Sequence, residues 1–259
     1  MKYIINKPNL SSLEKKYVLE AMDSTWLSSG GKNTKIFEER FAKYLGLKNA
    51  LAVQSGTASL HLALKALDVT NKDYVVIPNF TCVSNISAAS QCGAKIILVD
   101  VEPETLGMDF KILEKVLKKY KPKALQLVHV YGFPARDTLK IVKICKKNKI
   151  KIIEDSSEAL GASINEKKVG SLGDINVTSI RSEKMIGVGE GAVISTNNKD
   201  LFNKISLIAS RYSPFRRSTD SYWKKYFVSG EGYNYLMPHL LGSIARAQIE
   251  RFKKDLVLK

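Results

Sequence analysis

The 259-residue sequence predicts an α/β fold with a mostly parallel central sheet and helices on both faces of the sheet. Short segments that are apolar throughout, bounded by turn residues, have the length of β-strands. Segments with a helical apolar period alternate with these strands along the chain. A strand that is apolar at every position is buried on both sides, as in parallel sheets covered by helices.

The first elements are predicted to be helices. Ser11 and Glu14 form a capping box at the start of a helix over residues 11–22. A second helix, over residues 33–45, has Gly46 placed to cap its carboxyl end. The apolar face of this second helix consists of Phe37, Phe41, Tyr44 and Leu45.

Strands and helices then alternate. The predicted strands cover residues 50–55, 74–78, 95–101, 124–132, 149–155, 174–180 and 191–196. The predicted helices cover residues 57–67, 83–91, 109–120, 137–148 and 200–211. Ligands in such folds bind beyond the carboxyl ends of the strands, so the residues that follow each strand are the first candidates for a site.

Composition and motifs argue against several other classes of protein. The formal net charge is +16, but the basic residues are spread along helix faces and no helix-turn-helix, zinc-finger or RNP-type signature accompanies them, which favours a solvated surface over a nucleic-acid groove. No apolar run is long enough to span a bilayer, and the first residues lack the apolar core of a signal peptide. The three cysteines, Cys82, Cys92 and Cys145, have neither disulfide nor zinc spacing, so we expect reduced thiols, a cytoplasmic protein and no metal site.

Three strand ends carry polar residues, each with a structural and a functional interpretation. Residues 55–58, Ser-Gly-Thr-Ala, open a helix and form either an ordinary N-cap or a seat for a phosphate. Asp155 ends an apolar strand and either caps the next helix or pairs with a cationic ring nitrogen. For His129 we favour a satisfied core histidine over the wall of a pocket.

A fourth strand end leads to Lys184. A lysine in a glycine-rich turn is usually a solvated charge, and the interest of this one comes from its combination with the other strand ends. A phosphate seat, a buried carboxylate and a nucleophilic amine have a joint use in pyridoxal 5′-phosphate (PLP) chemistry. Ser179 precedes the lysine, and Gly187, Gly189 and Gly191 would let its loop move.

The same segments resemble the DegT/DnrJ/EryC1/StrS family of PLP-dependent sugar aminotransferases, which have the aspartate aminotransferase fold type I. Seven segments match in the family's order: residues 24–46, 52–67, 75–109, 128–135, 152–162, 173–192 and 232–250. The resemblance implies a three-layer α/β/α large domain.

The resemblance also implies roles for individual residues. Lys184 corresponds to the lysine that bonds to PLP, and it indicates transamination because relatives that dehydrate sugars have histidine there. Asp155 matches the carboxylate at the pyridine nitrogen. The residues that match phosphate-binding positions are Gly56, Thr57, Ala58, Ser179 and Asn234. Asn234 resembles an asparagine that reaches the cofactor of a neighbouring subunit, which implies a homodimer with shared active sites.

Three positions depart from the family pattern. Cys82 stands where many relatives have an aromatic ring that stacks on the cofactor, and Phe80, two residues earlier, need not replace that ring. Glu158 stands where many relatives have glutamine near the phenolic oxygen of PLP, and a carboxylate there would disfavour the phenolate unless it were protonated or paired. Ala192 replaces the second glycine of the usual Gly-Glu-Gly-Gly.

The expected activity is transfer of an amino group from an amino acid, glutamate in most relatives, to a nucleotide-linked keto-deoxy-sugar for polysaccharide, lipopolysaccharide or glycan biosynthesis. We expect a PLP-binding large domain over residues 1–239, with an N-terminal arm over about 1–32, and the start of a connecting helix over 240–259. In the family a smaller C-terminal domain follows, and we expect that domain to be largely absent from these 259 residues. Two alternatives stay open: a truncated, non-catalytic homologue that acts as a binding module, and a nucleic-acid-binding protein driven by charge.

Overall fold

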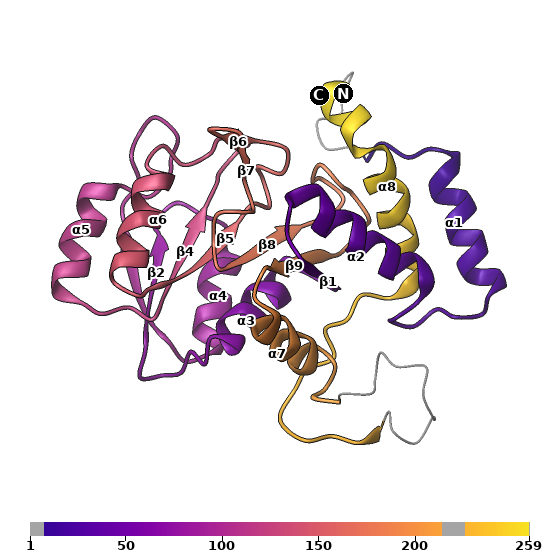
Figure 1. Cartoon of the computed structure of the whole chain (residues 1–259), viewed down its shortest axis with the longest axis horizontal. Coiled ribbons are helices and arrows are strands. Elements are labelled where there is room, and N and C mark those ends of the chain that lie inside the picture. Colours follow the sequence, from indigo (N-terminus) through magenta and orange to yellow (C-terminus); the bar gives the residue numbers. More distant parts are fainter. Residues whose placement is uncertain (1–7, 214–225, 259) are drawn as a thin grey trace.

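A seven-stranded sheet forms the centre of the computed structural model, which describes residues 8–213 and 226–258 (Figure 1). Its strands are β1 (Asn49–Val53), β2 (Tyr74–Pro78), β3 (Lys95–Val99), β4 (Ala124–Val128), β5 (Lys151–Asp155), β8 (Ile175–Ser179) and β9 (Ala192–Thr196). Their order across the sheet is β1-β9-β8-β5-β4-β2-β3, and only β9 runs antiparallel to its neighbours. The predicted, mostly parallel sheet is therefore confirmed.

Helices cover both faces of this sheet (Figure 1). The helices are α1 (Ser12–Asp23), α2 (Lys32–Leu45), α3 (Gly56–Ala66), α4 (Val83–Gln91), α5 (Phe110–Lys119), α6 (Thr138–Lys147), α7 (Lys199–Ala209) and α8 (His239–Leu258). One core cluster joins the sheet to α3, α4 and α7, a second joins it to α2 and α8, and a third joins it to α5 and α6. Neighbouring residues of one strand enter different clusters: Val75 belongs to the first and Val76 to the third. This alternation explains why apolar residues occupy successive positions in β2, while the polar residues buried in other strands, such as Gln126 in β4 and Glu154 in β5, form hydrogen bonds.

The predicted start of the first helix and the predicted end of the second helix are also confirmed. The Ser11 side chain accepts a hydrogen bond at the start of α1, and the Glu14 side chain accepts one from the Ser11 backbone, as a capping box requires. Gly46 ends α2 in the left-handed conformation, with φ at 75°. Phe37 and Phe41 are fully buried beneath α8.

Several strand bounds differ from the prediction by about two residues, since β3 ends at Val99 and β5 begins at Lys151, and two further differences have a local cause. β4 ends at Val128 and not at residue 132, because the chain turns at Tyr131 and Gly132, both with positive φ. A short hairpin, β6 (Ser163–Ile164) and β7 (Lys167–Lys168), was not predicted, since two-residue strands carry too few residues to show a period. Within the two described ranges, no helix has the length and apolar character needed to cross a membrane.

Candidate active site

A cavity of about 530 Å³ lies where several parallel strands end and the chain turns toward the helices. It is lined by residues that follow β1, β2, β4, β5 and β8. Most of the predicted site residues line it together: Gly56, Thr57, Cys82, Asp155, Glu158, Ser179 and Lys184. Asp155 and Lys184 thus share one cavity, as the PLP hypothesis requires.

The N-terminus of α3 forms one wall of the cavity. Ser55 is the N-cap, and its side chain accepts a hydrogen bond from the N–H of Ala58. The N–H groups of Gly56 and Thr57 have no protein partner within the described residues, so they are available to an anion at the positive end of the helix dipole. The capping role and the phosphate-seat role of residues 55–58 are therefore compatible.

Hydroxyl groups surround this helix end. Thr57 Oγ1 lies 3.0 Å from Ser84 Oγ, and both residues line the cavity. Ser179 ends β8, and its backbone N–H donates to Ser157 Oγ at 2.9 Å. A Cβ atom added to Gly56 would lie 3.4 Å from the Ser179 Cβ, which shows how closely the strand end approaches the helix end. These side chains add further donors beside the two free N–H groups.

Asp155 is held in a fixed orientation. Its Oδ1 accepts from the N–H of Ser157 at 3.0 Å, and its Oδ2 accepts from Asn85 Nδ2 at 3.1 Å. Asp155 is 5% exposed, and a turn, not a helix, follows it, so it does not cap a helix. Neither Asn85 nor Ser157 is a cation, so the negative charge of Asp155 is not neutralised by these two partners. Because Asp155 also lines the cavity, its carboxylate is available to a positively charged group of a ligand.

Lys184 is not a solvated charge. Its side chain is 19% exposed, and its Nζ lies 3.1 Å from Glu158 Oε1. The other oxygen of Glu158 accepts from the N–H of Tyr131 at 3.0 Å. The structure therefore pairs the glutamate that replaces the family's usual glutamine with the lysine itself.

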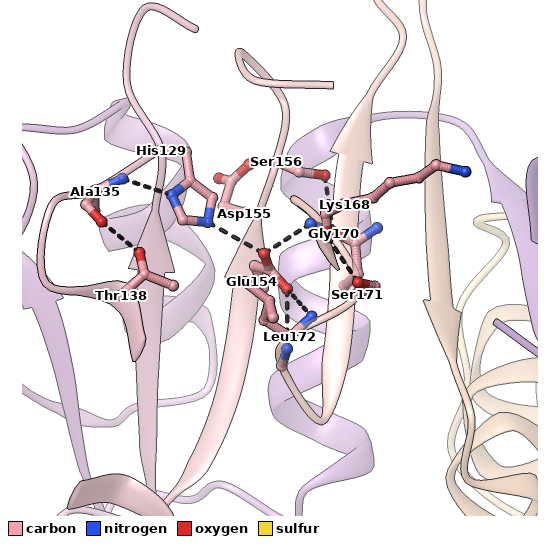
Figure 2. A network of polar contacts seen from close by, with 12 residues as sticks. His129, Ala135, Thr138, Glu154, Asp155, Ser156, Lys168, Gly170, Ser171 and Leu172 are labelled. Atoms are coloured by element: carbon pink, nitrogen blue, oxygen red, sulfur yellow. Dashed lines mark hydrogen bonds and ion pairs between the residues drawn. The ribbon is translucent and has the colours of Figure 1, made fainter. Parts of the chain in front are cut away.

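His129 satisfies both interpretations made from the sequence, because it is a fully buried core histidine and also lines the cavity. Its Nδ1 accepts from the N–H of Ala135, so its Nε2 carries the hydrogen and donates to Glu154 Oε1 at 3.2 Å (Figure 2). Glu154 also accepts from the backbone N–H groups of Gly170, Leu172 and Gly173.

The Glu154 carboxylate is fully buried. Burial alone would raise its pKa, but the hydrogen bond from His129 and those from the backbone outweigh burial and hold the pKa below its ordinary value. Glu154 is thus a buried anion that joins the loop over residues 170–173 to β5, beside Asp155.

The mouth of the cavity carries aromatic side chains. Phe80 and Tyr131 are exposed, and their ring centroids lie 6.1 Å apart in an edge-to-face arrangement. Tyr131 has a φ of 52°, which is uncommon for an aromatic residue and is often found at functional sites. Cys82 lines the same cavity as the N-cap of α4.

Two of the predicted cofactor-binding residues, Ala58 and Asn234, and the family departure Ala192 lie outside the cavity lining. Ala58 is buried in α3, where its N–H is already bonded to Ser55, and Ala192 is buried in β9. Asn234 is exposed and forms an isolated β-bridge with Ser210. Its position leaves open the role expected of it toward a second subunit.

Sequence reasoning missed several residues of the site. The clearest is Asn85, which is fully buried and donates to Asp155, while its own Oδ1 has no partner among the described residues. A polar residue on the inner face of α4 was the available signal. Tyr131, Ser157 and Arg181 gave no such signal, because each lies in a loop whose path has no sequence period.

Comparison with known proteins gives close relatives. The chain is 38% identical to GDP-perosamine synthase from Caulobacter vibrioides over 253 residues and 37% identical to GDP-perosamine synthase from Escherichia coli O157:H7 over 252 residues. Each alignment covers 97% of this chain, but only 66% and 67% of the relative. The chain therefore spans about two thirds of the length of these curated relatives.

Solved structures with a similar fold include an aminotransferase and a sugar enzyme with bound PLP. The aminotransferase from Psychrobacter cryohalolentis superposes with a TM-score of 0.87 at 27% identity, over 95% of this chain and 63% of the other. GDP-4-keto-6-deoxymannose-3-dehydratase with a trapped PLP-glutamate geminal diamine superposes with a TM-score of 0.88 at 25% identity, over 97% of this chain and 69% of the other. The family profile matches residues 8–257, and the chain belongs to the DegT/DnrJ/EryC1/StrS aminotransferase family.

Proposed function

We propose that the protein is a PLP-dependent aminotransferase that transfers an amino group from glutamate to a nucleotide-linked keto-deoxy-sugar. One observation carries this proposal: a single cavity holds the Lys184 amine, the buried Asp155 carboxylate and the free N–H groups at the start of α3. A product of this kind would serve polysaccharide, lipopolysaccharide or glycan biosynthesis.

The groups of the cavity match those of PLP. Two unpartnered N–H groups and neighbouring hydroxyls suit its phosphate, a buried carboxylate suits its ring nitrogen, and a primary amine suits its aldehyde. Gly56, Thr57 and Ser179 would hold the phosphate, Asp155 would hold the ring nitrogen, and Lys184 would form the covalent bond. Cys82 and Glu158 line the space that remains for the ring.

Each side chain has a defined chemical task. When bound, PLP supplies an electron sink, which allows an amino group to pass between an amino acid and a carbonyl compound. Asp155 keeps its charge directed at one point because Asn85 and Ser157 hold both of its oxygens. Lys184 provides the amine that retains the cofactor, and when that amine is free it accepts and returns a proton at Nζ.

The relatives support the choice of substrate. The curated relatives described above are GDP-perosamine synthases, which makes a GDP-linked keto-sugar the first candidate. The structure that contains a PLP-glutamate adduct supports glutamate as the donor. The same Lys184–Asp155 arrangement gives no support to a non-catalytic binding module.

We also propose a cytoplasmic homodimer. Cys82, Cys92 and Cys145 are free thiols, as expected in a reducing compartment. Asn234 is exposed outside the cavity, where a second copy of the chain could meet it. Light scattering coupled to gel filtration should give twice the chain mass, and a monomer at micromolar concentration would refute the dimer.

An amination assay tests the proposed function directly. Purified protein with PLP and ¹⁵N-labelled glutamate is incubated with GDP-linked and UDP-linked 4-keto-6-deoxy-sugars, and the product is analysed by mass spectrometry. We expect labelled nitrogen in a GDP-linked amino sugar, and none with Lys184→Ala. Protein that binds PLP but aminates no nucleotide-linked keto-sugar would refute the proposed substrate class.

A further inference from the structure

One carboxylate group connects two of the loops that form the cavity. Glu158 lies in the turn after β5, and its Oε1 contacts Lys184 Nζ in the loop between β8 and β9 at 3.1 Å. Its Oε2 accepts from the backbone N–H of Tyr131, in the turn after β4, at 3.0 Å. Each oxygen therefore has its own partner.

The rest of the Lys184 loop does not need this contact. Backbone hydrogen bonds join Ile180 to Gly191 and Val188 to Ile180, so the loop supports itself. The two carboxylates of this loop are occupied as well, because Arg181 pairs with Glu183 at 3.3 Å and with Glu190 at 3.1 Å.

The position of the lysine amine, by contrast, depends on Glu158. Among residues 8–213 and 226–258, Glu158 is the one partner that the Lys184 side chain has. The pair is partly shielded, with side-chain exposures of 19% for the lysine and 35% for the glutamate. The ammonium group is thus held inside the cavity by a single contact.

We propose that Glu158 is a positioning residue that clamps the Lys184 ammonium group in the cofactor-free protein and releases it when PLP is captured. On release, Nζ gives one proton to solvent and forms a double bond to the aldehyde carbon. Its two other hydrogens leave with the aldehyde oxygen as water. This inference rests on the proposed function, because it assumes that Lys184 is the amine that captures PLP.

The ion pair with Glu158 slows every reaction in which the Lys184 amine must first be free. Breaking a partly exposed ion pair corresponds to a factor of about two to five in rate. Glu158→Gln separates the two contacts of the residue, since its amide oxygen still accepts from Tyr131 while its amide nitrogen cannot hold an ammonium group. Glu158→Ala removes both contacts.

The first test needs no cofactor. Trace labelling with acetic anhydride, quantified peptide by peptide by mass spectrometry, measures the reactivity of each lysine in folded protein. We expect Lys184 to react about two to five times faster in Glu158→Gln and in Glu158→Ala than in wild type. Lys151 serves as an internal control, because it lies 3.1 Å from Asp174 in a separate ion pair and should not change.

The second test measures covalent capture of PLP at Lys184 by stopped-flow absorbance. We expect the capture rate in Glu158→Gln to rise by the same factor as the labelling rate. A slower capture would show that Glu158 only supports the cavity wall and would overturn the proposal. Unchanged labelling of Lys184, or a change in Glu158→Ala alone, would overturn it too.

The two tests also separate the proposals. If labelling behaves as expected but wild-type protein never captures PLP at Lys184, the ion pair is real and the proposed function is wrong. If PLP is captured and labelling does not respond, the proposed function stands and the clamp is wrong.

Discussion

Glu154→Gln is expected to destabilise the protein strongly, although the change removes no carbon atom. Wild-type Glu154 accepts hydrogen bonds from His129 at 3.2 Å, Gly170 at 2.7 Å and Leu172 at 2.7 Å (Figure 2), and a fourth from Gly173 at 2.9 Å. Two of these donors meet each carboxylate oxygen. A glutamine amide has one accepting oxygen, so its nitrogen must face one of the two pairs of donors.

The magnitude follows from this count. Two donors lose their acceptor, either the buried pair from His129 and Gly170 or the half-buried pair from Leu172 and Gly173, and each costs about 1–3 kcal/mol. The amide hydrogens of the glutamine would face N–H donors, so they would form no hydrogen bond there. We therefore expect the free energy of unfolding to fall by about 2–6 kcal/mol, which is a large part of the stability of an ordinary domain.

Urea unfolding followed by circular dichroism measures this difference. Glu104→Gln is a matched control, because Glu104 is 67% exposed and pairs only with Arg136 in the described part of the chain. We expect this control to change the free energy of unfolding by less than about 0.5 kcal/mol. A loss below about 1 kcal/mol for Glu154→Gln would refute the assignment of Glu154 as the anion that holds this loop.

Further predictions concern other parts of the fold. Gly170→Ala should lower the free energy of unfolding, measured with urea, by more than about 1 kcal/mol, because Gly170 has a φ of 94° and an added Cβ would lie 2.9 Å from Asn176 Oδ1. Phe41→Ala should cost about 3–5 kcal/mol in the same assay, since the ring is fully buried. Stability should fall as the pH drops below about 4.5, because Glu154 has a lowered pKa and must take up a proton on acid unfolding, and unfolding curves at several pH values test this. Cys82 should react with Ellman's reagent in native protein and Cys145 only after unfolding, because burial raises the pKa of Cys145 to about 12.

Much of the fold follows from local patterns. Strands buried on both faces are mostly apolar, so the apolar runs of β2, β4 and β5 stand out in the sequence, and the capping box at Ser11 marks the start of α1. The antiparallel direction of β9 could not be predicted from the sequence, because a strand buried on both faces has the same composition in either direction.

Local sequence patterns predict a side chain of the candidate site where a strand or helix fixes it, whereas Glu158, which lies in a turn, was predicted from the resemblance to the family. Asp155 ends β5 and Gly56 begins α3, so both positions follow from the alternation of strands and helices. The partners of these residues do not follow. The contact between Lys184 and Glu158 joins two loops 26 residues apart, and the contact between Asn85 and Asp155 spans 70 residues. Such pairings depend on how loops pack, for which the sequence has no period.

The identity of the reactive amine is the most direct test of the proposed chemistry. Protein mixed with an equimolar amount of PLP is reduced with borohydride, digested and analysed by mass spectrometry, with Lys184→Ala and Asp155→Asn in parallel. We expect the pyridoxyl group on the peptide that contains Lys184 in wild type, weaker labelling in Asp155→Asn and none at that peptide in Lys184→Ala. Labelling scattered over the surface lysines, equal in all three proteins, would contradict the assignment of this cavity as a PLP site.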